Sequence, residues 1–185
     1  MTVAENRSIV AFAIVKVAVA GAAYFLMRLN PKWKDINFVG GHAKERDAGS
    51  LERTARRELW EEVPSIRRYS EFHLEALTSR MRYGPIESLS RGGLIEYEVQ
   101  FFLVRIDRSP EALVKMLGSR SKNLWVSQYE LLFQNRFRVS GLVKFLDDAY
   151  PGGLNCIPYS SGTDLGLMRD RIERLDGKQL EFALK

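Results

Sequence analysis

The stretch that most restricts how this chain can fold is its apolar beginning, "SIVAFAIVKVAVAGAAYFLMRL", residues 8 to 29. A run of this length is long enough for a membrane-spanning helix, which needs about 20 apolar residues. Lys16, however, would lie near the middle of such a helix, where a charge is costly. The run is rich in Val and Ile and contains a small-residue turn at Ala20-Gly21, which favours buried strands. We therefore predict two core strands here, and a membrane or export segment is the less favoured alternative.

The rest of the chain mixes strand and helix patterns without a linker that would divide it. A third short strand ends at Gly40-Gly41, a helix spans residues 51 to 62, and a long strand covers residues 93 to 106. The other predicted segments are a strand from Phe72 to a turn at Gly84-Pro85, a strand over residues 123 to 128, and helices that begin near Ser109 and Ser140. With 185 residues, the chain is long enough for one domain with a hydrophobic core. This order predicts a single α/β or α+β domain.

The composition restricts the chemistry more than the fold. A single cysteine, Cys156, cannot form an internal disulfide, which is typical of a reducing compartment and predicts a cytoplasmic protein. Only two histidines are present, which argues against a multi-histidine zinc site and leaves metal binding to carboxylates and a hard cation. The net charge of +5 favours anionic ligands. Because the basic residues are spread along the chain, nucleic acid stays a minor alternative as a partner.

Three glutamates lie close together on the predicted helix, since Glu58, Glu61 and Glu62 are spaced i, i+3 and i+4. At this spacing the carboxylates share one helix face and repel one another unless a cation or basic partners balance them. Such oxygen ligands suit Mg²⁺ or Mn²⁺, which bind carboxylates together with water and substrate phosphates. Arg57 lies four residues before Glu61 and can hold it in place. An ordinary solvated helix is the alternative, because glutamates are mostly exposed.

The surroundings of this helix resemble the Nudix hydrolase family. "RELWEE", residues 57 to 62, matches the helical half of that family's signature, the Nudix box. "FVGGH" before it looks like the family's strand with a glycine entry, and "YFLMRLNPKWKDINFVGG" looks like its second and third strands. "EYEVQFFLVRI" and "NLWVSQYELLF" look like later segments of the same fold. The resemblance covers roughly residues 8 to 150.

This resemblance implies an α/β fold, the Nudix-type α/β/α sandwich with a mixed sheet. It also implies hydrolysis of a pyrophosphate bond in a nucleoside diphosphate derivative, with Mg²⁺ or Mn²⁺ as cofactor and a nucleotide-type small molecule as substrate. In such a site Glu58, Glu61 and Glu62 are the metal ligands, and Arg57 orients them. A backbone carbonyl of the glycine pair, which we assign to Gly41, lies near the metal.

The family usually needs one more carboxylate, as general base or extra metal ligand, and its place varies. Glu130, in "SQYELLF", is our first choice, and Glu87, Glu96 and Glu98 are the alternatives. A general base must lie within hydrogen-bond reach of the attacking water, which a sequence cannot test.

Residues that bind the substrate are harder to select from the sequence. Arg80 and Arg82 flank a loop together with Arg91, and they can clamp phosphates, although solvated loop arginines look the same. His42 follows the glycine pair and is a candidate for phosphate contact. Two aromatic residues are candidates for stacking on a base, although burial or edge packing is the interpretation we favour for each: Tyr83 and Trp33.

The first half of the Nudix signature is altered in this chain. Counting back from Arg57, the family's first glutamate falls on Gly49 and its first glycine on Ala43. Three acidic residues are candidates to replace the missing carboxylate: Glu45, Asp47 and Glu52. Pro64 stands where the family closes the helix with glycine, so the helix must end differently. These changes leave open a second function, a Nudix-fold nucleotide-binding or regulatory module with impaired catalysis.

We predict two parts in the chain, a Nudix-like domain over residues 1-150 and a C-terminal extension over residues 151-185. The extension contains a loop, "PGGLNCIPYSSGTD", and then a helical pattern, "LGLMRDRIERL". In the interpretation we favour, the extension packs on the same domain, and a homodimer contact is the alternative.

Overall fold

The computed structural model describes residues 6–19, 21–32, 34–68, 72–87, 93–107, 113–114, 122–134 and 138–161. The strands are β1 (Asn6–Ile14), β2 (Lys16–Val19), β3 (Ala22–Asn30), β4 (Asp35–His42), β5 (Phe72–Ala76), β6 (Met81–Glu87), β7 (Leu94–Ile106), β8 (Asn123–Ser127) and β9 (Arg138–Val139). The helices are α1 (Leu51–Glu62), α3 (Gln128–Phe133), α4 (Gly141–Ala149) and α5 (Gly153–Cys156), with 3-10 turns η1 (Glu45–Asp47) and η2 (Pro64–Arg68). The helix predicted near Ser109 lies mostly outside the described residues.

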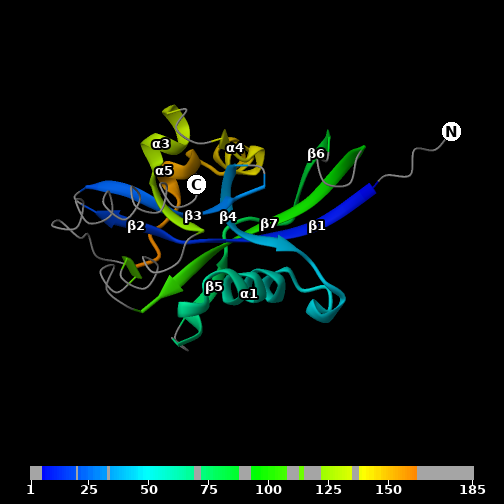
Figure 1. Ribbon diagram of the computed structural model, residues 1–185, viewed down its shortest axis with the longest axis horizontal. Helices are drawn as coiled ribbons and strands as arrows, with labels where there is room; N and C mark the ends of the chain where they lie inside the picture. Colours follow the sequence, from blue (N-terminus) through cyan, green and yellow to red (C-terminus); the bar gives the residue numbers. More distant parts are fainter. Residues whose placement is uncertain are drawn as a thin grey trace.

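The strands form one mixed sheet between two layers of helices. Their order is β2-β3-β4-β1-β7-β5, and β6 pairs with β7, β8 with β3, and β9 with β4. The pairs β1–β7 and β4–β9 are parallel, and the others are antiparallel. Figure 1 shows α1 on one side of the sheet and α3, α4 and α5 on the other. A separate buried cluster fills each side. This arrangement confirms the predicted α/β/α sandwich.

The apolar beginning of the chain forms core strands, but there are three of them where we predicted two. The strand predicted over residues 8 to 19 is interrupted at Val15. The physical reason is a change of partner, because β1 pairs with β4 and β7, whereas β2 pairs with β3. Among the described residues, no helix has the length and apolar character needed to cross a membrane.

Lys16, the charge within this apolar run, is buried against the start of the C-terminal extension. Its Nζ donates hydrogen bonds to three backbone carbonyls at 2.8, 3.0 and 2.8 Å: Leu154, Asn155 and Ile157. It also lies 4.8 Å from the centre of the Tyr159 ring. Burial lowers the pKa of this ammonium to about 8. Residues 162–185 lie outside the described residues, so the role of the whole extension stays a prediction.

The strand predicted from Phe72 to a turn at Gly84-Pro85 is wrong in detail. The chain makes two strands here, β5 and β6, and both pair with β7. β7 is long enough to hold them end to end, β5 along residues 102–106 and β6 along 94–99. Gly84-Pro85 lies inside β6, where the register shifts between Tyr83 and Ile86, so it interrupts the ladder without ending the strand.

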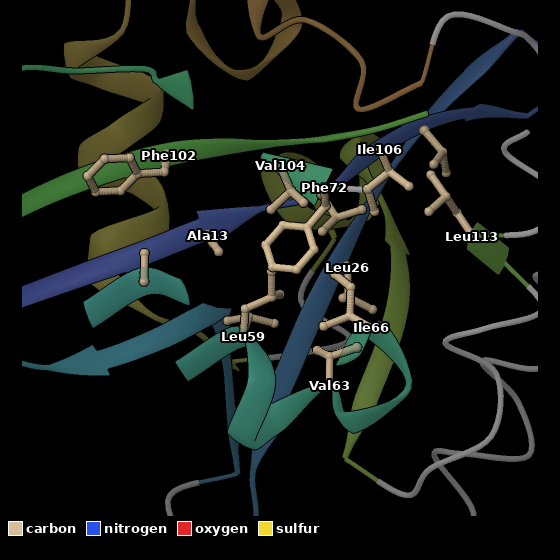
Figure 2. Close-up of a cluster of buried hydrophobic side chains, with 14 of the residues drawn as sticks. Ala13, Leu26, Leu59, Val63, Ile66, Phe72, Phe102, Val104, Ile106 and Leu113 are labelled. Carbon is tan, nitrogen blue, oxygen red and sulfur yellow. The ribbon is translucent and has the colours of Figure 1, made fainter. Parts of the chain in front are cut away.

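Helix α1 begins and ends close to the predicted bounds and packs beneath the sheet. The Ser50 side chain caps its start by accepting a hydrogen bond from the Arg53 amide at 3.3 Å. Leu51 and Leu59 are fully buried on one stripe of the helix. Figure 2 shows Leu59 directed from α1 toward Phe72, within the cluster that α1 shares with the sheet. This packing holds the helix beside β4, which carries the glycine pair.

Candidate active site

The glycine pair at the end of β4 allows α1 to approach the sheet closely. A Cβ atom added to Gly41 would lie 2.8 Å from the carboxylate carbon of Glu58. A side chain at this position would therefore displace the Glu58 carboxylate. Glu58 is correspondingly buried, with 9 % of its surface exposed. Glycine at this position lets the Glu58 carboxylate pack against the backbone.

Asp47, one of the three residues predicted to replace the missing carboxylate, is the one bonded to Arg57. Arg57 donates to Asp47 in a bidentate manner, from Nε to Oδ1 at 3.0 Å and from Nη2 to Oδ2 at 2.9 Å. The same guanidinium donates to the backbone carbonyl of His42 at 2.8 Å and to the Glu58 carboxylate. Hydrogen bonds from Arg57 hold the pKa of Asp47 well below its usual range. Arg57 therefore ties the loop, the end of β4 and the helix together.

The altered loop folds so that a carboxylate two positions early reaches Arg57. Asp47 ends the 3-10 turn η1 and is buried. Its Oδ2 accepts from the Lys44 amide at 2.9 Å and from the Thr54 hydroxyl at 3.0 Å. The turn leaves Ala48 and Gly49 with φ of 50° and 74°, so the glycine relieves one of two left-handed positions. Of the other candidates, Glu52 pairs with Arg56 on the exposed side of α1 at 3.2 Å.

Glu61 and Glu62, on the last turn of α1, each have basic partners. Glu61 is partly exposed, and its Oε1 accepts from Arg46 at 2.6 Å. Lys44 and Arg57 approach its other oxygen at 3.7 and 3.4 Å. Glu61 therefore lies within a basic group that includes the loop.

Glu62 is the more buried of the two carboxylates, and both of its oxygens are engaged. Oε1 lies 2.6 Å from Nε of Arg28, and Oε2 accepts from the Gly40 amide at 3.2 Å. Burial raises the pKa of Glu62 to about 7, although the Arg28 charge opposes the rise. Glu58 and Glu61 raise this pKa further by repulsion. A cation near Glu62 would oppose this rise in its pKa.

The donor set suits a hard divalent cation, but it is not gathered around a single point. Carboxylate oxygens are the ligands that Mg²⁺ and Mn²⁺ prefer. Within the described part of the chain, no three His, Cys, Asp or Glu side chains converge on a point where they could hold a metal ion. Glu58, Glu61 and Glu62 each contact arginine here. A shared cation would need Glu61 or Glu62 to exchange an arginine for the metal.

The end of α1 shows how the helix closes without the usual glycine. The Val63 amide donates to the Leu59 carbonyl at 2.8 Å, and η2 then begins at Pro64. The carbonyl of Glu62 accepts a hydrogen bond from the Asn123 side chain of β8 at 3.0 Å. Asn123 is buried and caps a carbonyl that a helix end leaves without a partner. It therefore supports the turn that carries Glu62.

Two adjoining cavities lie near the end of α1, and Glu62 lines the first of them. We call the first the Arg28 cavity; it has a volume of about 340 Å³ and is lined by Arg28, Leu29, Asn30, Pro31, Asp35, Asn37, Phe38, Gly40 and Glu62. The second, the Tyr83 cavity, has a volume of about 460 Å³, and its lining includes His42, Tyr83, Glu87, Tyr97, Arg138 and Ser140. Both are lined by Asn30, Asp35, Asn37 and Gly40. The pair makes a polar depression that runs from Glu62 toward two tyrosines.

The predicted substrate residues are only partly brought to these cavities. His42 lines the Tyr83 cavity, and its Nδ1 lies 2.7 Å from the Ser8 hydroxyl. Arg80 bonds to Glu98 and to the Gly49 carbonyl, each at 3.0 Å. Neither Arg80 nor Arg82 lines either cavity, so their role with substrate stays a prediction. Two further candidates, Trp33 and Arg91, lie outside the described residues.

Glu130, our first choice for the general base, has a structural contact instead of a cavity position. Its Oε2 accepts from the amide and hydroxyl of Ser127 at 3.0 and 2.8 Å, which completes a capping box at the start of α3. Glu96 and Glu98 pair with Arg7 and Arg80. Of the four predicted candidates, Glu87 is the one that lines the Tyr83 cavity. The identity of the base stays a prediction.

Sequence reasoning missed the polar residues of the β3–β4 hairpin. Arg28 and Asn37 are cross-strand partners, as are Asn30 and Asp35, and all four line the Arg28 cavity. Burial raises the pKa of Asp35, whereas the charge of Arg138 lowers it. The available signal was the alternation of polar residues at the end of two otherwise apolar strands. Such alternation indicates a polar face, but it does not say that the face lines a site.

Comparison with solved structures agrees with the topology. NrtR from Shewanella oneidensis is 19% identical over 68% of this chain and 55% of its own, with a TM-score of 0.50. A NUDIX hydrolase from Nitrosomonas europaea is 16% identical over 85% of this chain and 100% of its own, with a TM-score of 0.48. A mutT/nudix family protein from Listeria innocua is 18% identical over 72% and 84%, with a TM-score of 0.47.

The likeness to NrtR agrees with this architecture, and the chain has the Nudix fold, an α/β/α sandwich around a mixed sheet. The chain matches little more than half the length of NrtR. No protein-family model matches the sequence, and no curated protein is similar to it. At these identities the likeness extends to the fold alone, so the function has to be argued from the residues.

Proposed function

We propose that this protein is a divalent-metal-dependent hydrolase of a pyrophosphate bond in a nucleoside diphosphate derivative. One observation carries the proposal: Glu58 packs against Gly41 and is bonded to Arg57, which is itself anchored by Asp47. These contacts hold the helical half of the Nudix signature in place, although the sequence of the loop before it is altered. Glu62 follows one turn later, at the edge of the Arg28 cavity.

Glu58, Glu61 and Glu62 would hold Mg²⁺ or Mn²⁺, and the carbonyl of Gly41 is the predicted backbone ligand. When bound, the metal would neutralise pyrophosphate oxygens and lower the pKa of a coordinated water. The chain itself would fix the carboxylates through Arg57. His42 lines the same depression, together with Arg138 and the two tyrosines, and these groups suit a ligand with a phosphate and an aromatic base.

The test is to incubate the protein with a panel of nucleoside diphosphate derivatives and Mg²⁺ or Mn²⁺, and to measure the release of a nucleoside monophosphate. We expect Glu62→Gln to lower turnover by roughly 10- to 1000-fold, since the neutral side chain cannot balance a cation. Glu52→Gln is the matched control, because Glu52 lies on the same helix, is exposed and pairs only with Arg56 among the contacts described. A folded protein without turnover on any member of the panel would remove the proposal.

A second candidate is a Nudix-fold module that binds a nucleotide without hydrolysing it. The observation that favours it is the set of arginines on the glutamates, because Arg28, Arg46 and Arg57 balance these charges without a metal. This candidate predicts nucleotide binding in calorimetry that is unchanged by removal of divalent cations, together with no turnover. Binding that disappears with EDTA would argue against it.

A further inference from the structure

The ion pair between Arg28 and Glu62 occupies the point where the Arg28 cavity meets α1. Arg28 lies on β3, and its Nε is 2.6 Å from Oε1 of Glu62. The Gly40 amide takes the other oxygen, so neither oxygen of Glu62 is left without a polar partner. Both side chains line the cavity, and 28% and 15% of their surfaces are exposed. A cationic side chain and an anionic side chain of the cavity lining are therefore paired with each other.

A second arginine–glutamate pair on the same helix turn provides a comparison. Arg46 lies at the same distance, 2.6 Å, from Glu61. The side chains of this pair are 60% and 38% exposed, so water can replace either partner at little cost. Arg28 is held in a more enclosed place, where the loss of a partner leaves a charge poorly solvated. Competition between the paired arginine and a cation for the carboxylate should therefore be strong at Glu62 and weak at Glu61.

We propose that Arg28 and Glu62 form an internal latch that couples binding of a cation to binding of an anionic phosphate ligand. A cation on Glu62 displaces Arg28 from its paired carboxylate and leaves Asp35 as the other acidic side chain that lines the cavity. A phosphate on Arg28 likewise leaves Glu62 without its cation. Binding of both ligands restores the balance of charge, so each ligand strengthens the binding of the other. The choice of cation and phosphate rests on the proposed function, although the coupling concerns binding and does not require turnover.

The coupling is reciprocal, since two ligands that share one equilibrium must favour each other equally. It also makes Arg28 a competitor of the cation as well as the residue that binds the phosphate. Loss of a residue that only supports the fold weakens cation binding, whereas loss of a competitor strengthens it. The direction of the change therefore separates the two roles.

The first experiment measures binding of Mn²⁺ alone by electron paramagnetic resonance at about pH 8, where ordinary carboxylates are ionised. We compare the wild-type chain with Arg28→Met and Arg46→Met. Each substitution removes one guanidinium and leaves a methionine side chain, so the two variants are matched. We expect Arg28→Met to bind Mn²⁺ roughly 5- to 50-fold more tightly than the wild type, and Arg46→Met to change little. Arg28→Lys keeps the charge and should stay close to the wild type.

The second experiment uses sodium pyrophosphate as the probe in calorimetry with EDTA present. Glu62→Gln frees the guanidinium of Arg28, so pyrophosphate should bind several-fold more tightly than to the wild type. Glu61→Gln removes the same charge on the exposed pair and is the matched control. This arm stands even if Arg28→Met does not fold.

Mn²⁺ binding to a folded Arg28→Met that is no tighter than to Arg46→Met overturns the latch. So does equal pyrophosphate binding by Glu62→Gln and Glu61→Gln. Failure of the proposed function has a different result, which is absence of turnover by the wild type. A protein with the predicted binding changes and no turnover retains the latch and loses the hydrolase.

Discussion

The two halves of the site use the same residue types in different ways. In the inner half, Asp47, Arg57 and Glu58 are bonded to one another and to the end of β4. In the outer half, Glu61 pairs with Arg46, and Glu62 pairs with Arg28. Both halves pair arginine with carboxylate, but they differ in what surrounds each pair.

The inner half is more enclosed, whereas the outer half faces the Arg28 cavity and the solvent. The side chains of Arg57 and Asp47 are 11% and 4% exposed, and Asp47 has other donors besides the guanidinium. Glu62 lines the cavity and Glu61 is more exposed. The difference teaches that the inner charges chiefly hold the helix in place, while the outer charges exchange partners more readily because they are more exposed.

Arg57→Met should have the largest effect on stability. It leaves the buried Asp47 carboxylate without its cation, and removal of one partner of a buried pair typically costs about 3–5 kcal/mol. The free energy of unfolding in urea measures this change. Arg46→Met is the control from the outer half, and an equal loss in both variants would contradict the comparison.

Acid should destabilise the inner half through Asp47. The pKa of Asp47 is lowered in the folded state, chiefly by Arg57. The unfolded chain therefore binds the proton more readily, and the stability from Asp47 is present above its ordinary pKa of about 3.9 and is lost as pH falls below it. Asp47→Asn lacks this contribution, so the difference in unfolding free energy between wild type and variant should shrink below about pH 4. A constant difference down to low pH would show that Asp47 is not the acid-sensitive group.

Local patterns were sufficient to predict helix α1 and the strand that carries the glycine pair. The bounds of α1 follow from Ser50 as cap and from the proline after the helix, and the glycine pair stands at the end of a strand. The order of strands and helices predicted a single α/β or α+β domain. The bounds of α1 and the end of the strand depend on neighbours in the sequence, which is why periodicity and caps identify them. The α/β/α sandwich was implied by the resemblance to the Nudix family.

Three contacts of the site could not be predicted, those made by Asp47, Asn123 and Arg28. They depend on residues that are distant in the sequence or on the conformation of a loop. Asp47 reaches Arg57 only because η1 turns the loop, and its spacing differs from the family signature. Asn123 caps the helix from β8, far along the chain from Glu62. Arg28 gave no signal of its own, since an arginine at the end of a strand is ordinary. Each of these three positions requires the fold to be known first.

Asn123→Ala should have an intermediate effect, because it removes the donor to the Glu62 carbonyl. An unpaired backbone carbonyl at a partly buried helix end costs about 1–2 kcal/mol. Thermal unfolding measures the loss, and Asn155→Ala, at an exposed asparagine, is the control. If the two variants unfold at the same temperature, the amide of Asn123 does not support the last turn of α1.

Glu61→Gln should have the smallest effect on stability and a clear effect on function. Exposed ion pairs contribute at most about 1 kcal/mol, so we expect the unfolding free energy to change by less than about 0.5 kcal/mol. Under the proposed hydrolase, the same variant should lose turnover, because Glu61 is a predicted metal ligand. The two measurements on one sample separate a residue that holds the fold from a residue that holds a ligand. A Glu61→Gln protein that is as destabilised as Arg57→Met would place Glu61 with the inner half, and one that retains both stability and turnover would leave the cation to Glu58 and Glu62.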